Sequence, residues 1–107
     1  MRMKRETTNR GFYRFTFTDR YQKECSIQES SLATEACIWL GINDANPQIM
    51  ASQSGRFGVS TEETCGWIPY PVPDDVSFDT RMHLTRKQAK HLGEMLIRFA
   101  ETGELSK

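Results

Sequence analysis

The segment from Thr85 to Gly103 is the stretch of this sequence with the clearest helical period, and it limits what the chain can fold into. Thr85 stands three residues before Gln88, which is the Thr-x-x-Gln form of a capping box, and Gly103 suits a left-handed helix end. The spacing predicts a helix over residues 86 to 102. Its apolar stripe, which we expect to pack on the rest of the fold, comprises Ala89, Leu92, Leu96, Phe99 and Ala100.

The earlier segments have the period of strands instead. Residues 11 to 17 and 23 to 28 alternate between two faces, and residues 18 to 21 between them favour a turn, so the three segments predict a hairpin. Residues 36 to 42 are apolar at every position, as in a central strand covered on both sides, and residues 77 to 84 alternate again. We therefore predict an α+β fold: an antiparallel sheet of about four to five strands with the C-terminal helix packed on one face.

The region between the last two predicted strands is rich in turn-forming residues. Pro47 can begin a short helix that runs to about Ser52, with Asn46 as its cap. Residues 52 to 66 are expected to be mostly loop. Proline at every second position allows residues 67 to 73 to form an edge strand at best, or a polyproline-like segment.

Length bounds the organisation of the chain. Its 107 residues suffice for one domain with one core, which leaves no room for an enclosed cofactor cavity, so we expect no cofactor. Residues 1 to 10 lack apolar periodicity and predict a mobile basic tail, whereas residues 11 to 107 predict a single α+β domain. No apolar run is long enough to span a membrane, so we expect a cytoplasmic protein without a membrane partner. The predicted helix covers one side of the strand at 36 to 42, so loops or a second copy must cover Trp39, and both a monomer and a homodimer stay open.

Charge is unevenly distributed although the net charge is zero. Residues 1 to 24 carry seven lysines and arginines against three acids, for a net charge of +4. Residues 25 to 79 carry one arginine against eight acids, for −7, and residues 80 to 107 carry six against three, for +3. The acidic middle can complement the basic ends, attract a basic partner, or be a solvated loop region.

The sequence contains no recognisable catalytic or metal-binding motif, and we predict neither an enzyme nor a metal site. His83 and His91 lack the spacing of metal ligands with other residues. The cysteines form no Cys-x-x-Cys pair; Cys25 and Cys37 are expected in the core, and Cys65 in an exposed loop.

One set of polar residues is suggestive because it follows the second predicted strand and the outward face of the last one. Should these strands be neighbours, hydroxyl, amide, guanidinium and imidazole groups would form one patch, able to bind an anion or a protein carboxylate. The alternative is that these side chains satisfy each other and nearby backbone. The candidate binding residues are Ser26, Gln28, Ser30, Ser31, Asp79, Arg81 and His83.

A second set interleaves basic and aromatic residues near the N-terminus, a pattern typical of nucleic-acid binding. The balanced net charge of the chain favours a merely solvated tail. The candidate nucleic-acid residues are Arg2, Lys4, Arg5, Arg10, Phe12, Tyr13 and Arg14.

Several blocks of the sequence resemble a family of short proteins of unassigned activity that tailed bacteriophages and prophages encode. The blocks are residues 17 to 21, 25 to 33, 38 to 41, 80 to 84 and 99 to 105, so the resemblance covers the chain from about residue 11 onward. It implies a phage accessory protein and supplies no catalytic residues. We therefore expect a protein that binds a host macromolecule, namely a protein of a defence or regulatory system; the alternatives are a nucleic-acid-binding factor and a binder of small anionic ligands.

Overall fold

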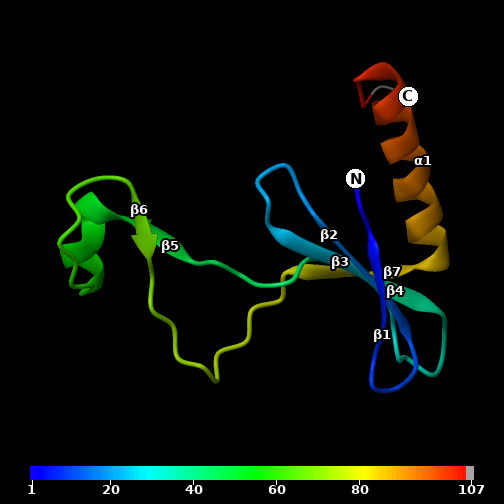
Figure 1. Cartoon of the computed structure of the whole chain (residues 1–107), viewed down its shortest axis with the longest axis horizontal. Coiled ribbons are helices and arrows are strands. Elements are labelled where there is room, and N and C mark those ends of the chain that lie inside the picture. The colour runs from blue at the N-terminus through cyan, green and yellow to red at the C-terminus, as the bar shows by residue number, and fades with distance from the viewer. Residues whose placement is uncertain (106–107) are drawn as a thin grey trace. The chain divides into compact units, whose positions relative to one another are not determined.

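A five-stranded antiparallel sheet is the largest element of the fold. The computed structural model describes residues 1–105. The strands β1 (Lys4–Thr7), β2 (Tyr13–Thr18), β3 (Glu24–Glu29), β4 (Cys37–Ile42) and β7 (Arg81–Thr85) lie in the spatial order β1-β2-β3-β4-β7 (Figure 1). The C-terminal helix α1 (Arg86–Thr102) contacts β7 and β4. The predicted α+β fold is thus confirmed.

The sheet and α1 form one compact unit, and residues Asp44–Asp79 form a second. The second unit contains a two-stranded sheet of β5 (Gln48–Met50) and β6 (Trp67–Pro69), with a 3-10 helix η1 (Ala51–Phe57) between them. It holds one arginine against six acids, so most of the acidic middle of the sequence lies in it. The single domain expected from residue 11 onward stays a prediction.

The predicted hairpin of β2 and β3 is confirmed, and its turn is built as the sequence indicates. Asp19 Oδ1 accepts the backbone N–H groups of Tyr21 and Lys23 at 2.8 and 2.9 Å. Phe15 pairs with Ile27 and therefore lies on the same face of the sheet as its partner. Strand β4 lies between β3 and β7, the interior position expected of an apolar strand.

Part of the N-terminal segment forms a strand, which corrects the expectation that residues 1 to 10 are a mobile basic tail. Lys4–Thr7 form the edge strand β1, in which Lys4 pairs with Thr16 and Glu6 with Arg14. All four residues of β1 are exposed. An edge strand of this kind is held by backbone hydrogen bonds to its neighbour, so apolar periodicity could not reveal it.

The short helix expected from Pro47 is also wrong. Residues 48 to 50 form β5, where Ile49 pairs with the buried Ile68 of β6, and Tyr70 N donates to Pro47 O at 2.9 Å. Pairing with a distant segment thus overrides the local helix signal. Trp67–Pro69 is indeed a strand of a two-stranded sheet, and the last strand of the main sheet starts at Arg81 rather than near residue 77.

The start and end of α1 agree with the sequence prediction. Gln88 N donates to Thr85 Oγ1 at 3.1 Å, and Thr85 N donates to Gln88 Oε1 at 3.0 Å, so both halves of the capping box are present. Gly103 adopts φ 76°, and its N–H donates to Phe99 O at 2.7 Å. This is the left-handed end that the glycine predicts.

The apolar stripe of α1 is less buried than the sequence predicts. Ala89 and Leu92 are half-buried, but Leu96 and Phe99 are 54% and 50% exposed, so they are not core residues. Thr85 is both the last residue of β7 and the helix cap, and no linker allows α1 to turn back across the sheet. A helix of 17 residues is about 25 Å long, so its C-terminal half extends beyond the strands that its first turns contact.

Candidate functional site

One face of the main sheet collects the polar residues that the sequence singles out. The pairing of the strands places Arg14 (β2), Gln28 (β3), Trp39 (β4) and His83 (β7) in one row across the sheet. The adjacent row on the same face contains Arg81, whose partner in β4 is Gly41. We call the five residues Arg14, Gln28, Trp39, Arg81 and His83 the polar face.

Gly41 allows the polar face to form. Strands β3 and β7 are not neighbours, because β4 lies between them, so the condition under which the sequence predicts one patch is not met directly. Gly41 has no side chain, and Arg81 Nη1 reaches over β4 to donate to Gln28 Oε1 at 3.0 Å. A Cβ atom on Gly41 would lie 2.7 Å from Thr80 O and 3.4 Å from Arg81 Cγ. The glycine thus makes room for contact between residues of β3 and β7.

Trp39 is the centre of the polar face. The ring of His83 stacks on its indole with centroids 3.9 Å apart and an interplanar angle of 7°. The Arg81 guanidinium lies 5.6 Å from the centroid of the same indole, within the range of a cation–π contact. Side chains of the same sheet therefore contact Trp39, which was expected to need a loop or a second copy as cover.

Ser30 fixes the position of the His83 ring. Ser30 Oγ lies 2.9 Å from His83 Nε2, and it accepts the backbone N–H of Leu32 at 3.1 Å. Because Leu32 belongs to the segment between β3 and β4, this hydroxyl links His83 to that loop. The imidazole is thus held by the indole on one side and by the hydroxyl at one edge.

Four of the seven predicted binding residues come together in this arrangement, namely Gln28, Ser30, Arg81 and His83. Ser26 has an exposed fraction of 0%, and its Oγ donates to Asn43 Oδ1 at 2.6 Å, so it is a structural residue beneath the surface. Ser31 is exposed in the loop after β3, and Asp79 belongs to the second unit.

Sequence reasoning missed Trp39 and assigned Arg14 to a different set. Because its whole strand is apolar, Trp39 was expected to lie under a loop or a second copy. The available signal was Gly41, two residues after Trp39. Both residues lie on the same face of β4, and β7 adds the side chains of His83 and Arg81 beside them on that face. Arg14 pairs with Gln28, and its Nε is buried without a hydrogen-bond partner among residues 1–105.

The basic and aromatic residues near the N-terminus do not form one surface. Lys4 and Arg14 lie on the same side of the sheet as Gln28, whereas Arg5 lies on the opposite side with its guanidinium 5.5 Å from the Tyr13 ring centroid. Phe12 is half-buried, and Arg2 and Arg10 are exposed outside the strands. The predicted nucleic-acid set is therefore divided between two faces.

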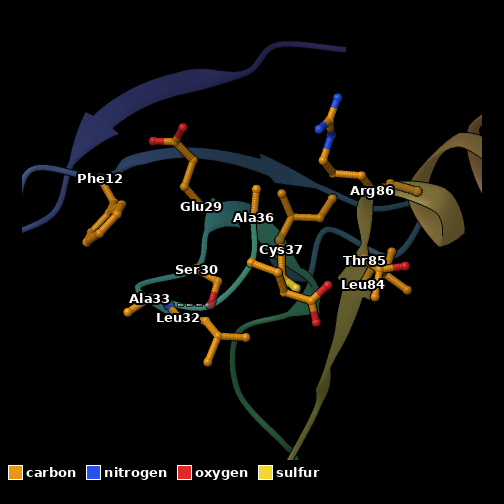
Figure 2. A pocket seen from close by; sticks show the side chains of 13 residues that line it. Phe12, Glu29, Ser30, Leu32, Ala33, Ala36, Cys37, Leu84, Thr85 and Arg86 are labelled. Carbon is orange, nitrogen blue, oxygen red and sulfur yellow. Dashed lines mark hydrogen bonds between the residues drawn. The ribbon is translucent and has the colours of Figure 1, made fainter.

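A hollow of about 480 Å³ is lined in part by Ser30, the residue that contacts His83 of the polar face. Its walls come from the loop after β3, the ends of β4 and β7, and the first turn of α1 (Figure 2). The hollow is open to solvent, and most of its lining is apolar. The apolar side chains include Phe12, Leu32, Ala33, Ile38, Leu84 and Ala89.

Cys37 lies in this hollow and is unsuited to act as a nucleophile. The residue is only 8% exposed, and burial raises the pKa of its thiol above the ordinary value of 9.0, as does the nearby Glu35 carboxylate. The thiol is therefore protonated at neutral pH. Within residues 1–105, no group of three or more histidine, cysteine or acidic side chains is placed to hold a metal ion, and no helix is long and apolar enough to cross a membrane.

Comparison with known proteins adds no relative: no protein-family model, curated protein or solved structure matches this chain. The resemblance to short phage proteins therefore stays a prediction from the sequence blocks. The polar face and the hollow beside it are the features on which a function can be argued.

Proposed function

We propose that this chain is a phage-type accessory protein that acts in the host cytoplasm by binding a host protein of a defence or regulatory system. The observation that carries the proposal is the preformed contact of Trp39 with His83 and Arg81. Tryptophan and arginine are the residues that most often dominate the energy of protein–protein binding. Side chains that are already ordered lose little conformational entropy on binding.

Arg81 suggests the chemistry of the partner. Its Nη1 donates to Gln28, which holds the guanidinium over the sheet and leaves further N–H groups for a ligand. A guanidinium matches a carboxylate through two parallel hydrogen bonds. The exposed ring of His83 beside it offers a flat surface for an apolar or aromatic side chain. The partner's contact segment should therefore combine an acidic residue with an aromatic or aliphatic neighbour.

Binding suits these groups better than catalysis. Ser30 and His83 lie within hydrogen-bond distance, as do a nucleophile and its base. However, Ser30 Oγ also accepts the Leu32 N–H. In the serine-nucleophile triad a carboxylate orients the imidazole, whereas here the imidazole is held by stacking on Trp39. We therefore assign the pair a positioning role for the polar face and assign the chain no enzymatic activity.

Affinity capture from a bacterial lysate tests the proposal, with the whole chain as bait and nuclease treatment as a second arm. The variant Arg81→Ala removes the guanidinium, and Arg81→Lys keeps the charge without the two-pronged geometry. Arg20→Ala, in the exposed turn between β2 and β3, is the matched control for loss of one arginine. We expect the intact chain and Arg20→Ala to retain the same nuclease-resistant protein, and both Arg81 variants to lose it.

Two results would reject this assignment. Equal capture by the intact chain and by Arg81→Ala would show that the polar face is not the binding surface. Loss of all capture after nuclease treatment would show that the partner is a nucleic acid.

Nucleic-acid binding is the second candidate, and a different observation favours it. Lys4, Arg14 and Arg81 share the side of the sheet that holds the Trp39–His83 stack. Arginine and lysine can contact phosphates while bases stack on an exposed aromatic ring. Glu6 of β1 pairs with Arg14 and lies on the same side of the sheet, where it lowers the positive charge. We therefore rank nucleic-acid binding below protein binding.

A further inference from the structure

We infer that the hollow lined by Ser30 and the first turn of α1 binds a small amphipathic amine, a ligand with one ammonium group and an apolar body. None of the five residues of the polar face lines this hollow, so the inference does not depend on the function proposed for that face. A volume of about 480 Å³ and a mainly apolar lining with few polar groups are typical of small-molecule sites. All of the lining residues belong to the unit formed by the main sheet and α1.

A row of three side chains crosses the sheet within the hollow. Glu29 of β3 pairs with Ile38 of β4, and Ile38 pairs with Leu84 of β7, so the three side chains lie on one side of the sheet. Ile38 and Leu84 therefore form an apolar strip that begins at a carboxylate. Two inter-strand spacings make the row about 10 Å long, which sets the length of a ligand that lies along it.

The Glu29 end of the row suits a cation. Tyr13 N donates to Glu29 Oε1 at 2.6 Å, which fixes the carboxylate beside Phe12, the residue that precedes Tyr13 and that also lines the hollow. Figure 2 shows Phe12 and Glu29 at the same end of the hollow, away from Arg86. A carboxylate oxygen accepts the N–H groups of an ammonium ion, and an aromatic face attracts its charge.

The basic residues of the chain do not neutralise this carboxylate. Within residues 1–105, Glu29 forms no ion pair, and neither Arg5 nor Arg10 lines the hollow. The guanidinium of Arg5 instead lies 5.5 Å from the centroid of the Tyr13 ring. The ammonium group of a ligand would therefore supply the positive charge that Glu29 lacks.

The other end of the hollow disfavours a second cation. Arg86 and Glu35 line the hollow here, and together with Lys87 they also line a second hollow next to it. The two basic side chains outweigh the one carboxylate at this end. A ligand with one ammonium group and an apolar tail therefore matches both ends, whereas a diamine of the same length would bring its second ammonium group near Arg86.

Octylamine is the probe that tests the inference, because its chain is about as long as the row and its amine is charged at neutral pH. Titration of the full-length chain, followed by amide chemical shifts, should give a dissociation constant of about 0.1 to 1 mM, as suits so small a ligand. The largest shifts should occur at Ala33, Ala36 and Ala89, which line the hollow. Octanoate and 1,8-diaminooctane should each bind about tenfold more weakly.

Variants separate the role of the carboxylate from that of the apolar lining. Glu29→Gln removes the charge but keeps an oxygen that accepts the Tyr13 N–H, and it should weaken octylamine binding about tenfold. Octanol should bind this variant and the intact chain equally, which checks that the hollow is still formed. Glu94→Gln, exposed on α1 and outside the hollow, is the matched control and should bind octylamine like the intact chain. Ala36→Phe fills the hollow and should abolish binding of both octylamine and octanol.

Any of four results would overturn the inference. Equal binding of octylamine by the intact chain and by Glu29→Gln would show that the carboxylate does not hold the amine. Octanoate binding as tight as that of octylamine would show that the hollow does not select a cation. Octylamine binding that Ala36→Phe leaves unchanged would place the ligand elsewhere on the chain. The last is an absence of octylamine binding up to about ten times the expected dissociation constant.

Discussion

The imidazole of His83 lies against the indole of Trp39, with ring centroids 3.9 Å apart and planes 7° from parallel, across the junction of β4 and β7. The contact joins two strands that are distant in sequence and covers an indole that would otherwise face water. It therefore contributes to the stability of the sheet as well as to the shape of the polar face.

The variant His83→Ala should expose Trp39 and lower the free energy of unfolding by about 1 kcal/mol, the scale of an aromatic pair. The background variant Trp67→Phe leaves Trp39 as the one tryptophan, so acrylamide quenching of fluorescence reports on its exposure directly. His83→Phe keeps a ring in place and should preserve the protection. Equal quenching of His83→Ala and its parent would argue that the ring does not shield the indole.

Gly41 and Gly93 should respond in opposite directions to the same substitution. Gly41 has φ 152°, and a Cβ there would lie 2.7 and 2.9 Å from backbone atoms of Thr80 and Arg81, so Gly41→Ala should cost about 2 to 3 kcal/mol. Gly93 lies within α1 with open space around it, so Gly93→Ala should stabilise by about 0.5 to 1 kcal/mol. Urea unfolding measures both. A neutral Gly41→Ala would mean that β7 can shift away from β4 without loss.

Local patterns in the sequence predicted local structure well. The capping box at Thr85, the hairpin turn at Asp19 and the two faces of β2 and β3 each depend on residues close together in the chain, and each is confirmed. The polar strand β1 could not be found in this way, because its partner β2 supplies the hydrogen bonds that define it.

The candidate site was predictable in composition but not in arrangement. Gln28, Arg81 and His83 were identified from alternation, which fixes the face of a strand on which a side chain lies. Alternation does not give the order of the strands in the sheet. No local pattern shows that β4 separates β3 from β7. Trp39 was missed for the same reason: an apolar strand gives no sign that polar side chains of its neighbour will cover one face.

Removal of the Thr85 hydroxyl should destabilise α1 at its first turn. Thr85→Ala deletes the acceptor of the Gln88 N–H and should lower the free energy of unfolding by about 1 kcal/mol. Thr85→Ser keeps the acceptor and should stay close to the intact chain. Thermal unfolding followed at a helical circular-dichroism wavelength compares the three proteins. Equal stability of all three would show that the Thr85 hydroxyl does not stabilise α1.

The cysteines should differ sharply in reactivity. Cys65 is exposed, whereas Cys25 and Cys37 are buried and their thiol pKa values are raised, chiefly by that burial. Iodoacetamide with mass spectrometry should therefore modify Cys65 in the native protein, and Cys25 and Cys37 only after urea unfolding. Rapid native modification of Cys37 would show that the hollow opens far enough to admit the reagent.

The same pKa shifts predict how the stability of the fold depends on pH. A buried thiol that stays protonated in the folded chain ionises first in the unfolded chain, near the ordinary pKa of 9.0. The contribution of Cys25 and Cys37 is thus fully present below pH 9.0 and is lost as the pH rises from there through the raised folded pKa. The variant Cys25→Ala should lose stability less steeply than the intact chain in that range, and identical slopes would contradict the assigned cause.

Binding to duplex DNA should be weak, with a dissociation constant no lower than about 10 µM at physiological salt, within the non-specific range. Deleting residues 1 to 10 is a poor test, because it also removes β1 from the edge of β2.

Lys4→Ala and Arg14→Gln instead each remove one possible phosphate contact from the side of the sheet that holds Trp39. Lys87→Ala on α1 is the control for loss of one charge. If the sheet bound DNA, each of the first two variants would reduce the slope of log affinity against log salt by about 0.9, and the control would not. We expect the three variants to be alike by fluorescence anisotropy. Nanomolar, salt-dependent binding that Lys4→Ala or Arg14→Gln weakens and Lys87→Ala leaves intact would instead reverse our ranking, since the sheet would then hold phosphates rather than a protein carboxylate.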